Sequence, residues 1–130
     1  MKQYQSLLES TFQDLFNPVK DVDAIRPYFD KDYTQWVDGK MLDYDGFFRH
    51  VTALKEVIAS AYIEFIEYIE DGDKVADIHD VFVTKKSGEK LHVRVMAFFT
   101  FKDQKIASVR ELTQLLVGDE ADQDIGSRLA

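Results

Sequence analysis

The stretch LHVRVMAFFTF, residues 91–101, decides the fold. Every odd position in it is apolar, whereas the even positions include His92, Arg94 and Thr100. This period of two is typical of a β-strand that buries one face and exposes the other. We therefore expect a long strand whose odd-numbered side chains face the core.

The same alternation begins near Ala59, and turn signals divide residues 59–117 into four long strands. The turn signals are Asp71-Gly72, Ser87-Gly88 and Asp103-Gln104. Hairpins link neighbouring strands in antiparallel order, so the pattern predicts a meander. Two-residue turns at the first two signals would place Asp80 opposite Ile63 and Val95, with the even positions of that strand facing inward.

The last hairpin allows two registers. A two-residue turn at Asp103-Gln104 would turn Arg110 inward, whereas a three-residue loop or a β-bulge would turn Glu111 inward. Burial of an arginine without a partner is costly. The bulged register, with Val109, Glu111 and Thr113 on the inner face, is therefore the one that we predict.

The first half of the chain has helical periodicity. Apolar residues at helical spacing predict an amphipathic helix over residues 4–16, which Asn17-Pro18 ends. Asp21 can cap a short second helix over residues 22–29, and residues 33–37 form a short strand. Asp43 or Asp45 can cap a third helix that runs to Ile58.

Composition excludes several classes of protein. The chain has 130 residues, no cysteine and a net charge of −8, which disfavours nucleic acid and anionic membranes as partners. Its longest apolar run, residues 95–101, is far too short to span a membrane, and MKQYQSLLES lacks the apolar stretch of a signal peptide. We expect a cytoplasmic protein with one domain over residues 1–117 and a loose, acidic polar tail over 118–130.

Three segments resemble one known family when they are taken in order: YFDKDYTQW (28–36), EDGDKVADI (70–78) and FTFKDQKIASVRE (99–111). They are similar to the SnoaL-like branch of the nuclear transport factor 2-like superfamily, over about residues 4–116. The resemblance implies an α+β fold in which three N-terminal helices pack in the concave face of a strongly curved, mixed but mainly antiparallel sheet, a cystatin-like cone. It leaves function open, because this superfamily includes polyketide cyclases, ketosteroid isomerases, dehydratases and noncatalytic binding modules.

The resemblance also implies which residues of this chain correspond to the functional residues of the family's enzymes. The oxyanion-binding Tyr and Asp of ketosteroid isomerases fall on Phe12 and Ala97, and their base falls near Val37, so that activity is disfavoured. The acidic residue of the polyketide cyclases falls on Glu111. Their first-strand His or Asn falls near Trp36, which cannot act as a base.

The predicted site combines two carboxylates with an apolar wall. Glu111 and Asp80 are the predicted catalytic pair, about 10 Å apart across one strand, and an apolar setting would raise their pKa values. A structural role for each is the alternative. His50 is expected at the surface or an edge, and a place at the cavity mouth, where it could share proton transfer with an acid, is the alternative. No spacing of the histidines suggests a metal, and we expect neither metal nor cofactor. The predicted binding residues for a small hydrophobic or aromatic molecule are Trp36, Phe12, Phe16, Tyr28, Phe65, Phe82, Val95, Phe99, Val109 and Thr113.

The opposite sheet face is more apolar than a solitary domain usually exposes. It predicts a homodimer through His79, Val81, Arg94, Met96, Phe98, Arg110 and Leu112. Two functions stay open: cofactor-independent acid–base chemistry of the cyclase, isomerase or dehydratase type, and noncatalytic ligand binding or dimerisation.

Overall fold

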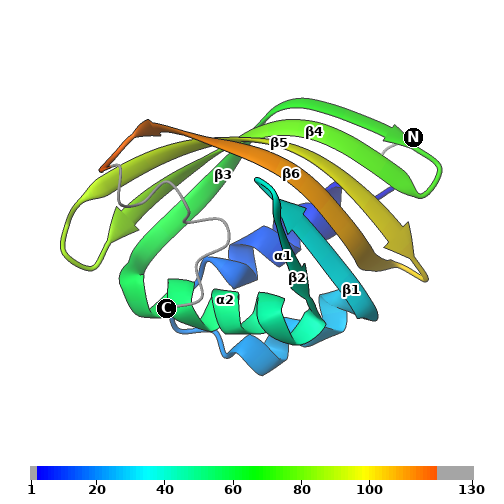
Figure 1. Cartoon of the computed structure of the whole chain (residues 1–130), viewed down its shortest axis with the longest axis horizontal. Coiled ribbons are helices and arrows are strands. Elements are labelled where there is room, and N and C mark those ends of the chain that lie inside the picture. The colour runs from blue at the N-terminus through cyan, green and yellow to red at the C-terminus, as the bar shows by residue number, and fades with distance from the viewer. Residues whose placement is uncertain (1–2, 120–130) are drawn as a thin grey trace.

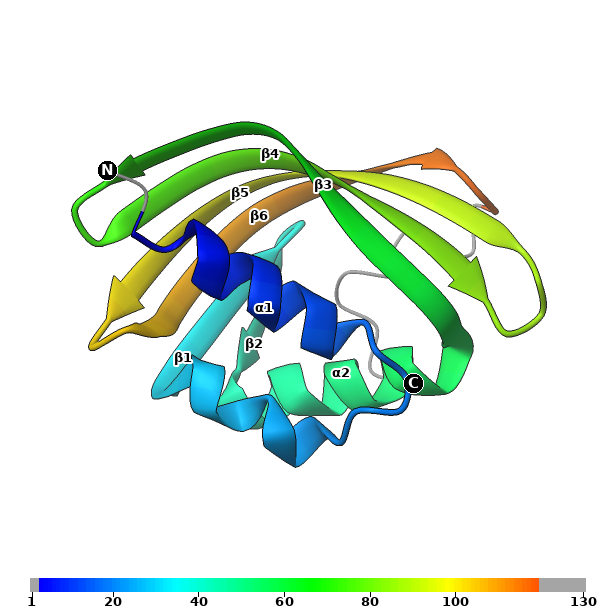
Figure 2. The ribbon, with the colours of Figure 1, turned by 180° about the vertical axis from the view of Figure 1, so that it is seen from behind.

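A strongly curved sheet covers two α-helices in the computed structural model, which describes residues 3–119 (Figure 1). The helices are α1 (Gln5–Leu15) and α2 (Tyr44–Val57), and both lie on the concave side of the sheet (Figure 2). The six strands are ordered β2-β1-β6-β5-β4-β3. The predicted α+β class is confirmed, and the sheet is mixed because β1 (Phe29–Val37) runs parallel to β6 (Lys105–Val117).

The predicted four-stranded meander is present. It consists of β3 (Ile58–Asp71), β4 (Lys74–Lys85), β5 (Lys90–Lys102) and β6, all paired antiparallel. In β5 the side chains of Leu91, Val93, Val95, Ala97, Phe99 and Phe101 are buried. The alternation of residues 91–101 therefore predicted the buried face correctly.

The predicted register of β4 is wrong by one residue. Lys85 N–H donates to the Glu89 carbonyl oxygen at 2.8 Å, so the hairpin loop is the three-residue segment 86–88, with Gly88 at φ +93°. A loop of three residues in place of two shifts the pairing by one residue, so Asp80 pairs with Arg94 and not with Val95. The odd positions of β4 consequently face inward, and the even positions face outward.

The turn between β3 and β4 also differs from the prediction. Asp71 pairs with Lys74, which centres the turn on Gly72-Asp73, and a register shift follows between Phe65 and Glu67. Phe65 therefore lies opposite His79, whereas the predicted pairing of Ile63 with Asp80 is wrong, because Ile63 pairs with Val81.

The last hairpin has the predicted bulge. Lys102 and Lys105 flank a two-residue turn in which both central residues have positive φ, and the register shifts one step further along. Ala107 is the extra residue, because Phe101 pairs with Ile106 and Thr100 with Ser108. This bulge turns Glu111 inward, opposite Ala97, and leaves Arg110 exposed.

The N-terminal half contains two α-helices where three helices were predicted. The middle one is a pair of short 3₁₀ turns, η1 (Val22–Ala24) and η2 (Arg26–Tyr28), because Pro27 interrupts a regular helix. Strand β2 (Lys40–Asp43) was not predicted, since it has four residues and follows a tight turn at Asp38-Gly39. Asp43 caps α2 by accepting a hydrogen bond from the Gly46 N–H at 2.8 Å.

None of the helices within residues 3–119 has the length and apolar character needed to cross a membrane. Most of the predicted acidic tail, residues 120–130, lies outside the described residues.

Candidate functional site

A cavity of about 110 Å³ lies between the concave face of the sheet and the two α-helices. Its wall is mostly apolar, and Phe12 and Phe16 of α1 form part of it. A few polar side chains interrupt this wall: Thr11, Tyr33, Gln35, His50, His79, Glu111 and Thr113. This combination is typical of a small-molecule site, in which apolar contacts supply affinity and a few polar groups fix orientation.

Glu111 lies on the cavity wall, as the bulged register predicted. Removal of its carboxyl from bulk solvent, together with the negative charges of Asp38 and Asp77, raises its pKa to about 8. At neutral pH this side chain is therefore mainly an uncharged carboxylic acid. It can donate a hydrogen bond or a proton, which an ordinary glutamate cannot do at that pH.

Two polar residues of β1 form a hydrogen-bonded chain that ends at Glu111. The buried Tyr33 hydroxyl donates to Gln35 Oε1 at 2.8 Å, and Gln35 Nε2 lies 3.4 Å from Glu111 Oε1. Tyr33 and Gln35 are two residues apart in one strand, so both side chains point to the inner face. The alternation of β1 therefore brings a hydrogen-bonded chain to the acid.

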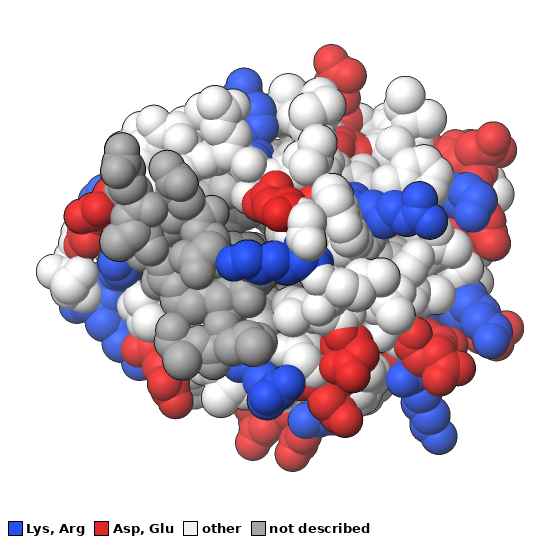
Figure 3. Space-filling view, viewed as in Figure 1, with Lys and Arg blue, Asp and Glu red and all other residues white. Residues whose placement is uncertain are grey.

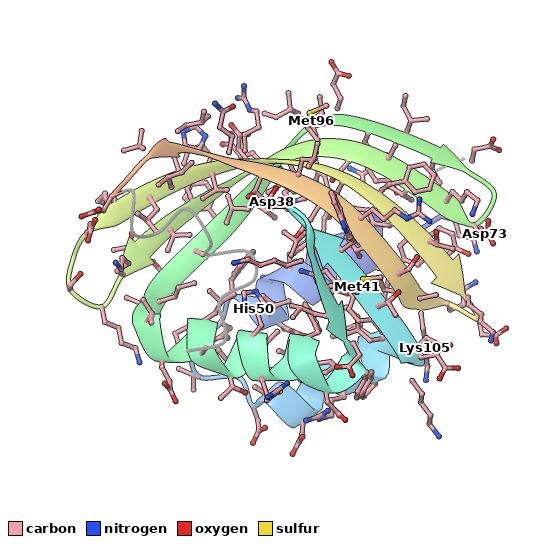
Figure 4. The ribbon with its side chains drawn as sticks, in the orientation of Figure 1. Asp38, Met41, His50, Asp73, Met96 and Lys105 are labelled. Carbon is pink, nitrogen blue, oxygen red and sulfur yellow. The ribbon has the colours of Figure 1, made fainter. Side chains whose placement is uncertain are left out.

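Hydrogen bonds connect the turn after β1 to β6, next to Glu111. Asp38 N–H donates to the Glu111 carbonyl oxygen at 3.1 Å. The Asp38 carboxylate accepts hydrogen bonds from the Thr113 N–H, at 2.8 Å, and from the Thr113 hydroxyl. Figure 4 shows Asp38 at the tip of the hairpin of β1 and β2, next to β6.

His79 and Asp77 form a buried pair on β4. His79 Nδ1 lies 2.8 Å from Asp77 Oδ2, and both side chains are almost completely buried. A carboxylate can only accept a hydrogen bond, so Nδ1 carries the hydrogen, and Nε2 is the ring nitrogen that can take up a proton. The Phe12 and Phe65 rings flank the imidazole at 5.3 and 6.2 Å between centroids.

Asp77, Ala97 and Glu111 lie in one row across three strands of the inner face. One strand separates the two acids, which places their Cα atoms about 10 Å apart. Asp77 Oδ1 is buried and accepts no hydrogen bond from the described residues 3–119. Asp77 therefore stands one strand away from Glu111, but it is not among the described residues that line the cavity, and the predicted second acid was Asp80.

His50 of α2 is also part of the cavity wall. Only 4% of its surface is exposed, so the expectation of a surface or edge histidine is wrong. Figure 4 shows it on α2, below the curved sheet. Its position on the helix stripe brings a second histidine to the cavity.

Asp80 lies on the outer face, and its predicted place in the cavity is wrong. Arg94 Nε and Nη2 donate to its two carboxylate oxygens at 2.8 and 2.9 Å, and His92 Nε2 lies 2.7 Å from Oδ2. Hydrogen bonds from Arg94, together with that of His92, lower the pKa of Asp80 to about 2. At neutral pH Asp80 is therefore the charged, buried member of an ion pair on the outer face.

Four of the predicted wall residues lie elsewhere. Phe82 stacks between Tyr62 and His92 on the outer face, because it occupies an even position of β4. Trp36 is an even residue of β1 and is 37% exposed. The Tyr28 hydroxyl donates to Asp14 outside the cavity. Phe65 packs beside His79 and is not among the described residues that line the cavity. The remaining predicted residues, Phe12, Phe16, Val95, Phe99, Val109 and Thr113, do line the cavity.

Sequence reasoning missed Asp77, His79, Gln35 and Tyr33 as members of the site. The register error placed Asp77 and His79 of β4 on the outer face. A three-residue loop at 86–88, in place of the predicted two-residue turn, would have placed them on the inner face. Tyr33 and Gln35 could have been found from the strand alternation alone, since Val37 shares their face.

The outer face also departs from the predicted partner surface. His79 and Val81 are buried inside, whereas Met96, Phe98 and Leu112 are 55%, 44% and 56% exposed. These three side chains border a groove with Trp36 and Arg110, and Figure 4 shows Met96 on the convex side of the sheet. On the face shown in Figure 3, Lys and Arg are interspersed with Asp and Glu.

The curved mixed sheet over two helices, with a polar cluster in an apolar cavity, defines a class of small α+β pocket proteins. The model of the SnoaL-like domain family matches residues 10–109, and the chain belongs to this family. An uncharacterized protein of Schizosaccharomyces pombe is 33% identical over 123 residues, which is 95% of each chain.

Solved structures show the same fold at low sequence identity. AusH from Aspergillus nidulans has a TM-score of 0.72 at 10% identity, covering 91% of this chain and 89% of its own. A Shewanella denitrificans protein named for SnoaL-like polyketide cyclases has a TM-score of 0.72 at 11% identity, covering 88% and 92%. The nuclear transport factor 2-like fold is therefore established.

Proposed function

We propose that this protein binds a small apolar molecule that carries a carbonyl group, and that it catalyses proton transfer on that molecule without a cofactor. Glu111 is the general acid or hydrogen-bond donor to the carbonyl oxygen, and His79 is the general base. The observation that carries the proposal is the pairing, on one cavity wall, of an uncharged carboxylic acid with a histidine whose tautomer is fixed.

The two groups are suited to opposite tasks. The neutral Glu111 carboxyl can stabilise the negative charge that develops on an oxygen when a neighbouring C–H bond loses its proton. His79, oriented by Asp77, presents Nε2 as a proton acceptor, in the way that a buried carboxylate orients the base of a catalytic triad. Acid and base on one wall can therefore act on neighbouring atoms of one ligand.

The cavity favours a compact ligand. An apolar cavity of about 150 Å³ admits a molecule the size of benzene, and this one measures about 110 Å³. Aromatic residues at the wall, among them Phe12 and Phe99, suit an aromatic ring or a short branched chain. The cyclase name of one structural neighbour is consistent with enolate chemistry on a carbonyl compound.

Butanone, a ketone smaller than benzene, can serve as the probe for this activity. The protein should accelerate exchange of the α-hydrogens for deuterium in D₂O, followed by proton NMR. His79→Gln and Glu111→Gln should each slow exchange by about 10²- to 10⁴-fold, the usual contribution of one acid–base group. Tyr28→Phe is the matched control, because its hydroxyl contacts Asp14 outside the cavity.

A noncatalytic ligand-binding module is the second candidate. The residues that correspond to the oxyanion donors of ketosteroid isomerases are Phe12 and Ala97, and neither can donate a hydrogen bond. Binding of butanone that shifts NMR signals of the cavity residues, without any acceleration of exchange, would favour this alternative.

We further propose that two copies associate through the convex sheet face. Its exposed apolar side chains Met96, Phe98 and Leu112 would be covered, and the groove that they border is flanked by Arg110 and Glu67. Opposite charges on one surface can pair across a two-fold axis, and such pairs fix the relative position of the two copies where their apolar side chains meet. Sedimentation equilibrium tests this association.

A further inference from the structure

The Tyr33 hydroxyl occupies a fixed position inside the core. Only 1% of the residue is exposed. Its ring makes edge contacts with Phe29 and Phe47, each at 4.9 Å between centroids, with interplanar angles of 72° and 60°. Such contacts on two sides leave the ring little freedom to move. The hydroxyl therefore cannot follow a partner that changes its orientation.

The Gln35 side chain connects this hydroxyl to Glu111. Its amide has one acceptor oxygen and one donor nitrogen at opposite corners. Tyr33 holds the oxygen through a 2.8 Å hydrogen bond, which turns Nε2 toward Glu111 Oε1 at 3.4 Å. A rotation of the amide by half a turn would exchange these two contacts and present an acceptor to the acid.

We propose that Tyr33 is a positioning residue that acts through the Gln35 amide to keep the Glu111 proton directed at the cavity. With Nε2 facing Oε1, a neutral Glu111 carries its hydrogen on the other oxygen, Oε2. With the amide reversed, the Glu111 O–H would donate to Gln35 Oε1 and would no longer be available to a ligand. This inference deepens the proposed function by naming the residues that set the orientation of its acid.

Other charged groups around Glu111 do not depend on Tyr33. Asp38 acts on it from the turn after β1, and Asp77 acts on it from β4. His79 and His50 line the same cavity from β4 and α2. Replacement of Tyr33 by phenylalanine removes one oxygen atom and leaves all four groups in place. A change in Glu111 titration in that variant therefore reports on the amide.

The expected effect has a definite sign. Without the Tyr33 hydroxyl, Gln35 Oε1 loses that hydrogen bond, and the amide can reverse to accept a hydrogen bond from protonated Glu111. The ionised form then loses a donor and the neutral form gains an acceptor, so the pKa of Glu111 rises. A shift of roughly 0.5 to 1 is expected for one hydrogen bond of ordinary strength.

Carboxyl ¹³C NMR titration of Glu111 in a double-mutant cycle tests the proposal. The four proteins are the wild type, Tyr33→Phe, Gln35→Met and the double variant, with Tyr28→Phe as the matched loss of a phenol hydroxyl. Tyr33→Phe should raise the pKa of Glu111 in the wild-type background and leave it unchanged in the Gln35→Met background. Tyr28→Phe should leave it unchanged.

An equal rise in both backgrounds would overturn the proposal, because Tyr33 would then act by some route other than the amide. Absence of any rise in the wild-type background would overturn it as well. If Tyr33→Phe does not fold, the wild type supplies the measurement: Gln35 amide protons should show contacts to Glu111 Hγ, and contacts to the Tyr33 ring instead would contradict the proposal. None of these readouts requires turnover, so they are separate from the fate of the proposed reaction.

Discussion

Glu111→Gln should make the protein more stable at high pH than the wild type, and little different at low pH. In the native state the pKa of Glu111 is about 8, against an ordinary value of 4.5. The native state thus holds this proton more tightly than the unfolded chain does. Stability from this group is fully present below pH 4.5, falls as the unfolded chain ionises, and is lost once the pH passes about 8.

The magnitude follows from the distance between the two pKa values. Each pH unit between them corresponds to about 1.4 kcal/mol, so the wild type loses up to about 5 kcal/mol relative to its low-pH stability. This is an upper limit, because ions and solvent can reach the cavity wall once the acid ionises. Even half of it would be a large fraction of the roughly 5–15 kcal/mol that stabilises a domain.

Urea unfolding of the wild type and Glu111→Gln between pH 4 and pH 9 measures the effect. Both proteins share every other titratable group, so the difference between their unfolding free energies isolates Glu111. The difference should be near zero at pH 4 and grow steadily to about pH 8. A difference that stays constant between pH 5 and pH 8 would show that the carboxyl titrates normally, and would refute its role as a neutral acid.

Three further changes test other parts of the molecule. Asp80→Asn should lower the midpoint of thermal unfolding at pH 7 and have little effect at pH 2, because the pKa of Asp80 is about 2 and its ion pair is lost on protonation; NMR signals of the cavity should not move. Phe12→Ala should cost roughly 2 kcal/mol in urea unfolding and admit a bulkier ketone, since the ring forms part of the wall; unchanged ligand selectivity would contradict this. Phe98→Glu should yield a monomer in sedimentation equilibrium without loss of stability, because the side chain is 44% exposed; an unchanged mass would contradict the proposed contact.

The fold could be predicted because β5 is unambiguous. Its odd positions are all apolar, and that single strand fixes which face of the sheet is buried. Strand β4 carries no such signal, since Val75, Val81 and Val83 on one face compete with Ile78 and Phe82 on the other. Which alternate side chains of β4 face the core therefore depended on the length of one loop, and sequence patterns determine loop length poorly.

Of the two predicted acids, only the one for which a physical penalty decided between registers was placed correctly. Burial of Arg110 would have left a charge without a partner, and that cost placed Glu111 correctly. Asp80 offered no such penalty, because an inward acid was compatible with the supposed chemistry. The partners that favour its outward position, Arg94 and His92, become visible only when the strands are aligned.

The inner row of Asp77, Ala97 and Glu111 depends on two irregularities of the meander. The loop of three residues at 86–88 turns Asp77 and His79 inward, and the bulge at Ala107 turns Glu111 inward. With a two-residue loop, Ile78 and Asp80 would face the cavity, and without the bulge Arg110 would do so. The loop brings His79 to the cavity wall with Asp77 hydrogen-bonded to it, the bulge brings Glu111, and neither irregularity creates the site alone. The spacing of the strands keeps the two acids close enough for the charge of Asp77 to help keep Glu111 protonated.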